Sequence, residues 1–145
     1  MTSIITSISK TLSANDTGET GGHQSGILVP RERRLLSFFP ALNETDYNPR
    51  AHLKLIDESG SEWQFAFIHY NNKLFGGTRN EYRLTRMTRF FREAQLTAGD
   101  VITLSRSPAG QYHIEFERQF EQRRDSQNVL RLGSGWKIID IDGGA

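Results

Sequence analysis

Residues 62–70 read EWQFAFIHY, and this stretch sets the fold class of the chain. Its aromatic residues alternate with polar or small ones, which is the pattern of a strand with one buried face. Ser59-Gly60 predicts a turn directly before it, and residues 51–58 (AHLKLIDE) alternate in part. The two runs therefore predict a β-hairpin. The aromatic side chains expected in the core are Trp63, Phe65, Phe67, Phe90 and Phe91.

Short runs of the same kind lie on both sides of this hairpin. The other strand candidates are residues 4–12, 82–84, 101–104, 112–116, 129–132 and 136–141. Two segments have helical spacing instead: residues 31–39, with Pro30 in the first turn, and residues 87–96. Many short strands with two inserted helices predict a mixed barrel or sandwich with little parallel sheet.

The composition places the chain among ordinary globular domains and excludes several functions. It has 145 residues, of which 36% are hydrophobic and 24% charged, so one domain with a real core is expected. No run of about 18 apolar residues predicts a membrane span, and residues 1–10 do not resemble a secretory signal. The absence of cysteine excludes disulfides, thiolate zinc sites and cysteine nucleophiles, and is consistent with an intracellular protein.

Positive charge is concentrated in residues 75–92, which read FGGTRNEYRLTRMTRFFR. The net charge of the chain is only +1, so this basic stretch is a local feature. Its cations are all arginines, whose planar fork of donors matches phosphate oxygens or the edge of guanine. They are Arg79, Arg83, Arg86, Arg89 and Arg92, and the last three are expected along the following helix. A solvated basic helix face is the alternative.

Arg79, Asn80 and Glu81 are three base-reading residue types in a row. Arg suits guanine, Asn suits adenine, and Glu can accept from the amino group of cytosine. In an extended chain Arg79 and Glu81 would point to the same side and could read one G·C pair or two adjacent ones. The alternative is that Glu81 forms a salt bridge that orients Arg79 or Arg83.

The chain lacks convincing active-site motifs. Residues 18–23 (GETGGH) are rich in glycine but lack the Lys and Ser/Thr of a phosphate-binding loop. The four histidines, His23, His52, His69 and His113, have no metal-ligand spacing, and Asp57, Glu58 and Glu62 lack the nearby Lys of a metal-dependent nuclease site. There is no Gly-x-Ser-x-Gly elbow. We therefore predict no catalytic residue and no metal site.

Residues 13–26 (SANDTGETGGHQSG) contain four glycines and predict a loop that is long for a connection inside one domain. Such loops tend to be functional or disordered. Residues 12–24 and 75–86 resemble the N-terminal effector domain of the EcoRII restriction endonuclease and its relatives. The spacing from residues 63–65 through 82–85 to 96–101 is similar to that of plant B3 DNA-binding domains. The resemblance covers residues 10–116 and fades over 117–145.

The resemblance implies a mainly β fold with two helices, the open seven-stranded pseudobarrel that these families share. It also implies sequence-specific binding of double-stranded DNA through the major groove at a CC(A/T)GG-like site. Two arms would grip the DNA: an N-terminal arm at residues 13–26 and a C-terminal arm at 76–86. The residues that it implies for DNA binding are Asn15, Asp16, Thr17, His23, Gln24, Thr78, Arg79, Asn80, Glu81, Arg83 and Arg86. Asn15 and Asp16 could equally hold the loop through Asx turns.

The same resemblance implies that residues 1–145 form a single domain at the N-terminal end of a longer, prokaryotic and cytoplasmic restriction endonuclease. A catalytic domain absent from this chain would use Mg²⁺, whereas this domain needs no cofactor, membrane or RNA partner. The relatives have Lys at the positions of Gly77 and Tyr82, so fewer phosphate contacts are expected here. The alternatives are a complete small endonuclease, a B3-like transcription-factor-type DNA-binding domain, and a protein-interaction barrel for an acidic partner.

Overall fold

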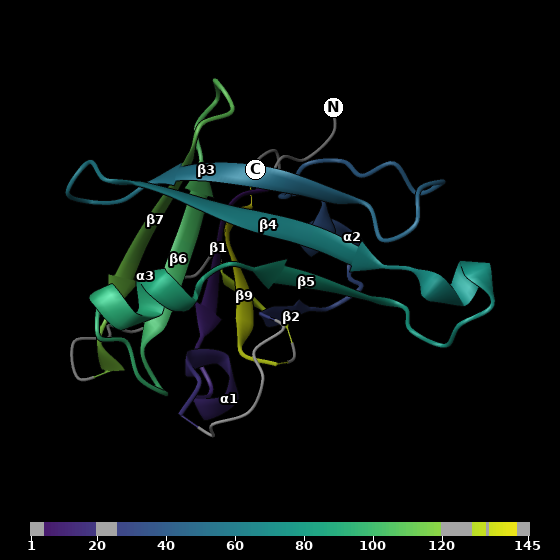
Figure 1. Cartoon of the computed structure of the whole chain (residues 1–145). Helices are drawn as coiled ribbons and strands as arrows, with labels where there is room; N and C mark the ends of the chain where they lie inside the picture. The colour runs from purple at the N-terminus through teal and green to yellow at the C-terminus, as the bar shows by residue number, and fades with distance from the viewer. Residues whose placement is uncertain (1–4, 20–25, 120–128, 133, 142–145) are drawn as a thin grey trace.

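One strongly curled sheet dominates the computed structural model, which describes residues 5–19, 26–119, 129–132 and 134–141 (Figure 1). Its strands are β1 (Ile5–Thr11), β2 (Ile27–Val29), β3 (Arg50–Ile56), β4 (Glu62–Tyr70), β5 (Glu81–Thr85), β6 (Val101–Arg106), β7 (Tyr112–Glu117), β8 (Val129–Arg131) and β9 (Trp136–Ile141). Their order across the sheet is β2-β5-β4-β3-β7-β6-β1-β9-β8. The predicted hairpin of residues 51–58 and 62–70 is confirmed as β3 and β4, with Leu53 opposite Phe65.

The described residues form nine strands, so the expected count of seven is wrong for this chain. Strands β1 to β7 account for the seven, and β9 and β8 extend the sheet beyond β1. The sequence runs at 129–132 and 136–141 were predicted as strands, and the structure confirms both. The sheet is antiparallel except for a short β3–β7 pairing at Leu55 and Ile56. The fold is therefore a mainly β open barrel with little parallel sheet, as predicted.

The helices are shorter than the sequence predicted. They are α1 (Ala14–Thr17), α2 (Arg33–Leu36) and α3 (Thr88–Glu93), with a 3₁₀ turn η1 (Asn72–Phe75). Pro30 lies outside α2, because the Glu32 carboxylate accepts the amide of Leu35 at 3.0 Å and makes Glu32 the N-cap. Helix α1 lies inside the segment predicted as a loop. None of the helices in the described ranges is long and apolar enough to cross a membrane.

The core inside the barrel contains the predicted aromatic side chains with one exception. Phe65, Phe67, Phe90 and Phe91 are buried. Trp63 is only half-buried, because its indole nitrogen reaches the Asp57 carboxylate at 2.8 Å on the β3–β4 turn. The largest fully buried side chain is instead Trp136 of β9.

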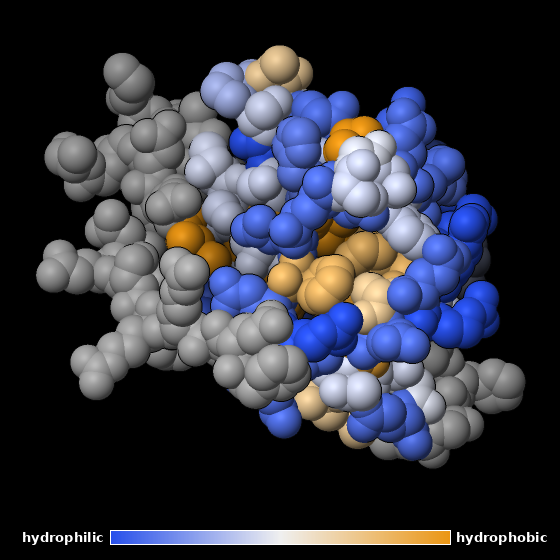
Figure 2. Space-filling view, turned by 90° about the vertical axis from the view of Figure 1, so that its left-hand side faces the viewer, coloured by the Kyte–Doolittle hydropathy of each residue, from blue (hydrophilic) through white to orange (hydrophobic). Residues whose placement is uncertain are grey.

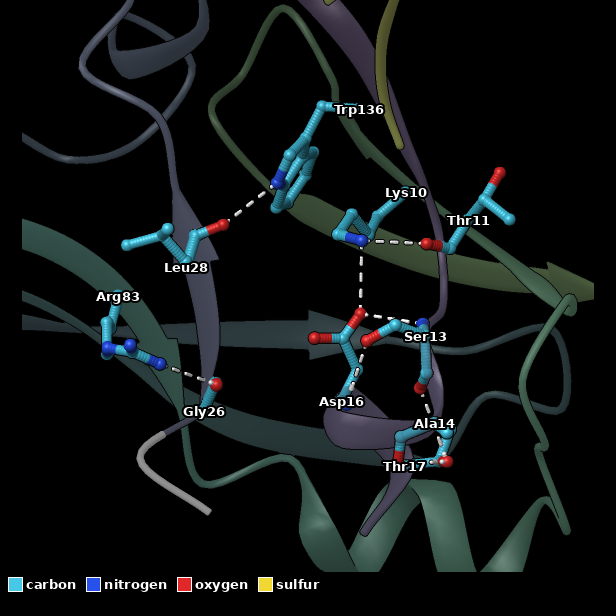
Figure 3. Close-up of polar contacts among 10 residues, drawn as sticks. All are labelled: Lys10, Thr11, Ser13, Ala14, Asp16, Thr17, Gly26, Leu28, Arg83 and Trp136. Carbon is cyan, nitrogen blue, oxygen red and sulfur yellow. Dashed lines mark hydrogen bonds and ion pairs between the residues drawn. The ribbon is translucent and has the colours of Figure 1, made fainter. Parts of the chain in front are cut away.

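Trp136 also bridges the seam of the open barrel. Strand β2 is one edge of the sheet, and β9 lies next to the other edge. The indole N–H of Trp136 donates to the carbonyl oxygen of Leu28 in β2 at 3.0 Å, which joins residues 108 positions apart (Figure 3). A half-open sheet with polar edge groups thus gains a specific link across its gap.

The change Trp136→Phe should lower the free energy of unfolding by about 2 kcal/mol, because it removes this hydrogen bond and some buried indole surface. Urea unfolding measures the effect. Trp63→Phe is the matched control and should cost less, since Asp57 keeps the hydrogen bonds from Ser59 and Ser61. Equal losses in the two variants would contradict a special role for the seam.

Candidate nucleic-acid interface

Strand β5 lies within the second segment predicted as a DNA-binding arm and is linked to the end of the first segment through β2. It pairs with β2, which directly follows residues 13–26, and with β4, which leads into the connection before residues 76–86. Leu28 and Tyr70 therefore lie opposite Arg83 and Glu81 of β5. The sheet register brings the end of the first segment, at Gly26, beside the end of the second, at Leu84 and Thr85, and Figure 1 shows β2 beside β5.

The first part of the N-terminal segment is a single capped helical turn. The Asp16 carboxylate accepts the amide of Ser13 at 2.9 Å, and the Ser13 hydroxyl accepts the amide of Asp16 at 3.1 Å. This capping box explains why four residues among glycines become helical. Gly18 ends the turn with φ 85°, a left-handed conformation that glycine adopts without strain.

A buried ion pair attaches this turn to the barrel. Lys10 Nζ of β1 lies 3.0 Å from Asp16 Oδ2, and the two side chains are only 7% and 10% exposed (Figure 3). Asp16 therefore has the loop-holding role that the sequence left open. Thr17 is half-buried and its hydroxyl bonds back to Ala14, whereas Asn15 is exposed. His23 and Gln24 lie outside the described residues.

The connection between β4 and β5 is built on two asparagines. Asn72 accepts the amide of Arg79 on its side-chain oxygen at 2.6 Å and that of Gly77 on its carbonyl oxygen at 2.7 Å. The fully buried Asn71 donates to the carbonyl of Asp46 at 2.7 Å. A Cβ at Gly77 would lie 2.7 Å from Asn72 Cγ, so this tight turn favours glycine at position 77.

Arg79, Glu81 and Arg83 form a continuous charged brace. Arg79 Nε donates to one oxygen of Glu81 at 2.6 Å, and Arg83 Nε donates to the other at 3.2 Å. The Arg79 guanidinium also lies over the Tyr70 ring, 3.8 Å from its centroid. The salt bridge considered for Glu81 is thus present. Contact of Glu81 with a base stays a prediction, as does a contact by the exposed Thr78.

Arg83 connects the brace to the N-terminal segment. Its Nη1 donates to the carbonyl oxygen of Gly26 at 3.2 Å (Figure 3). The two residues are 57 positions apart in the chain. One guanidinium therefore fixes the exit of the first segment relative to the strand that carries the second.

Asn80 is engaged by a buried histidine that the sequence did not single out. His69 Nε2 lies 2.8 Å from Asn80 Oδ1, and its Nδ1 contacts Glu44. Tyr82 stacks on His69 with ring centroids 4.0 Å apart, so its ring packs against the histidine. Bidentate reading of adenine needs both the oxygen and the nitrogen of an Asn amide. The contact with His69 uses that oxygen.

The remaining arginines of the basic stretch separate into two groups. Arg86 precedes α3 with φ 65° and is exposed, so its expected place along the helix is wrong; the helix begins only after Met87. Arg89 and Arg92 lie on α3 as expected. Arg89 pairs with Glu93 at 2.5 Å and is exposed.

The face beside α3 contains an apolar hollow surrounded by acidic side chains. A hollow of about 440 Å³ lies between the β3–β4 turn, α3 and β7. Figure 2 shows this apolar surface surrounded by hydrophilic side chains. Its apolar lining is Trp63, Phe90, Ala94, Ile114 and Phe116, and its carboxylates are Asp57, Glu58, Glu93 and Glu115. Four carboxylates make this hollow a poor site for a polyanion.

Within the described ranges, no three His, Asp or Glu side chains are grouped so that they could hold a metal ion.

Asp16→Ala should destabilise the protein by about 3 kcal/mol, because it leaves Lys10 buried without its partner. Urea unfolding provides the measurement. The double variant Lys10→Met/Asp16→Ala should recover part of the loss, since it buries no unpaired charge. A single variant as stable as the wild type would show that the pair does not hold the turn.

The brace also predicts a pH dependence. Burial alone would raise the pKa of Glu81, but hydrogen bonds and charges from Arg79 and Arg83 outweigh it and hold the pKa below the ordinary 4.5. The ionised group therefore stabilises the fold above about pH 4.5, and this contribution is lost as the pH falls through the lowered pKa. The difference in unfolding free energy between wild type and Glu81→Gln should be constant near neutral pH and shrink below about pH 4.5. A difference that does not change with pH would contradict the brace.

Comparison with known proteins gives one family and one fold. A family model described as restriction endonuclease EcoRII, N-terminal, matches residues 1–117. The type II restriction enzyme EcoRII of Escherichia coli is 46% identical over 82 residues, which cover 53% of this chain and 20% of that enzyme. A B3 domain-containing protein of Oryza sativa subsp. japonica is 33% identical over 135 residues, or 92% of this chain and 13% of that protein.

A solved structure of an Arabidopsis FUS3–DNA complex superposes with a TM-score of 0.57 at 19% identity, covering 76% of this chain and 94% of that one. This likeness shows a B3-like fold. The chain spans a fifth or less of the length of the two relatives named above. The family model covers β1 to β7, both predicted arm segments and the brace. The chain belongs to the family of EcoRII N-terminal domains.

Proposed function

We propose that the chain binds double-stranded DNA sequence-specifically through the major groove, as the effector domain of a longer restriction endonuclease. The observation that carries the proposal is the Arg79–Glu81–Arg83 brace, in which Arg83 also bonds to Gly26 at the end of the first arm segment. The E. coli relative is a restriction enzyme, and the FUS3 structure is a complex with DNA. The proposed target is a CC(A/T)GG-like site.

Arg79 is the residue proposed to read guanine. Its Nε donates to Glu81 and its guanidinium carbon lies 3.8 Å from the centroid of the Tyr70 ring, so the side chain is held on two sides. A guanidinium fixed in this way loses little conformational entropy when it binds a base edge. The major groove is about 12 Å wide and admits a two-stranded ribbon such as β4–β5.

The other predicted residues are proposed to position the arms, to contact the DNA directly or to act indirectly. Arg83 is proposed to position both arms, because it is bonded to Glu81 and Gly26. The exposed Asn15, Thr78 and Arg86 are proposed to contact the DNA directly, with His23 and Gln24 of the N-terminal arm. Asp16, Thr17 and Asn80 are proposed to act indirectly, because their side chains already bond within the protein.

Cleavage is proposed to belong to another domain of the full-length protein, in the cytoplasm, with Mg²⁺ held there. The carboxylates and histidines that the structure describes in this chain form no metal cluster. Site-specific cutting of a plasmid by this chain and Mg²⁺ would overturn this assignment and favour a complete small nuclease.

A gel-shift assay tests the proposal directly. The chain should bind a duplex with CC(A/T)GG more tightly than a scrambled duplex of the same composition, at a stated salt concentration. Equal affinity for both duplexes would refute sequence-specific recognition. No binding of either duplex at low salt would favour a protein-interaction barrel.

Arg79→Ala should lose about 1–3 kcal/mol of discrimination between the two duplexes. Arg89→Ala is the matched control, since it removes an exposed arginine of α3 whose partner is Glu93. It should leave the discrimination unchanged. If Arg79→Ala weakens binding to both duplexes equally, Arg79 contacts phosphate and not a base.

A further inference from the structure

The β4–β5 connection exposes a cluster of large apolar side chains. Leu74 and Phe75 of η1 are 68% and 51% exposed, and Tyr47 beside them is 60% exposed. Among the described residues, only Leu28 is a further large apolar side chain of this kind. We call Tyr47, Leu74 and Phe75 the apolar tip. Figure 1 shows η1 at the far end of the β4–β5 hairpin, projecting from the barrel.

The apolar tip is held in place by hydrogen bonds. The Asn71 side chain donates to the carbonyl of Asp46 at 2.7 Å and accepts the amide of Asn48 at 2.7 Å, which ties the loop that carries Tyr47 to η1. The edge of one ring meets the face of the other in the Tyr47–Phe75 pair, with centroids 5.5 Å apart and planes at 82°. Grouped, rigidly supported apolar side chains in water indicate a binding surface.

The turn that carries Leu74 and Phe75 is positively charged, whereas the loop that carries Tyr47 contains Glu44 and Asp46. Residues 71–80 contain two cations, Lys73 and Arg79, and no acidic residue. The amide of Lys73 donates to the carbonyl of Arg79 at 2.9 Å, so the tip and the brace belong to one turn. A DNA duplex that engages Arg79 in its major groove would therefore also meet the tip. The apolar group that the major groove offers is the 5-methyl of thymine.

We propose that the apolar tip reads thymine through its 5-methyl group, inside or directly beside the recognition site. This inference rests on the proposed DNA binding and adds a second kind of contact to it. The brace would supply hydrogen bonds to the edge of a guanine. The tip would supply an apolar contact with the 5-methyl group of thymine, which cytosine and uracil lack. Tyr47 backs the Phe75 ring, while Leu74, the most exposed of the three, makes the first contact.

Uracil differs from thymine only by lacking this methyl group, so replacing thymine with uracil tests the methyl contact alone. Fluorescence anisotropy would compare CC(A/T)GG duplexes in which deoxyuridine replaces each thymine of the site and its flanks in turn. Wild type should bind at least one substituted duplex about threefold to tenfold more weakly. Leu74→Ala and Phe75→Ala should bind the thymine duplex more weakly and should no longer distinguish it from the uracil duplex.

Two further variants serve as controls. Leu74→Met keeps an apolar side chain and should keep the preference for thymine. Leu28→Ala removes an exposed leucine from β2, outside the tip, and should also keep it. Unchanged circular dichroism spectra would confirm that the tip variants fold.

Each outcome is decisive. If wild type binds the site specifically but is indifferent to uracil at every position, the tip does not read thymine. If the tip variants retain the wild-type preference, another group reads the methyl and the proposal is wrong; a protein partner would then be the better explanation for the exposed tip. Failure of wild type to prefer CC(A/T)GG over the scrambled duplex would refute the proposed function instead.

Discussion

The guanidinium of Arg83 joins the two segments on which the proposed function depends. It bonds to Gly26 at the end of the first segment and to Glu81, whose second oxygen holds Arg79 in the other. Arginine can do this because its N–H groups point in several fixed directions, whereas the ammonium of Lys is closer to a point charge. The relative position of the two segments is thus fixed by strand β5 and the Arg83 side chain.

The barrel supplies the rigidity that this arrangement needs. Trp136 links β9 to β2 across the seam, and Lys10 anchors the helical turn of the first segment through Asp16. Side chains fixed to a sheet in this way are positioned more accurately than side chains on a loose loop. The acid-lined hollow lies beside α3, apart from the brace, so the surface charge is polarised even though the net charge is only +1.

The sequence predicted the strands well because alternation is a local signal. It missed α1, whose capping box lies among glycines, and it overestimated α2, where Glu32 caps the helix later than Pro30 suggested. The cluster of Arg79, Glu81 and Arg83 was visible because its members are two residues apart. The sequence could not predict Gly26 as the partner of Arg83 or His69 as the partner of Asn80, because only the sheet register brings these residues together. The packing of Tyr82 and the tight turn at Gly77 likewise needed the fold to be explained.

Both segments are proposed to contact DNA as one surface. Amide chemical shifts recorded by NMR while a CC(A/T)GG duplex is added test it most directly. Large changes are expected at residues 13–19 and 71–86 together, at the same DNA concentration, with little change at residues 57–61 and 93–94 around the acidic hollow. Changes confined to one segment, or centred on the hollow, would contradict it.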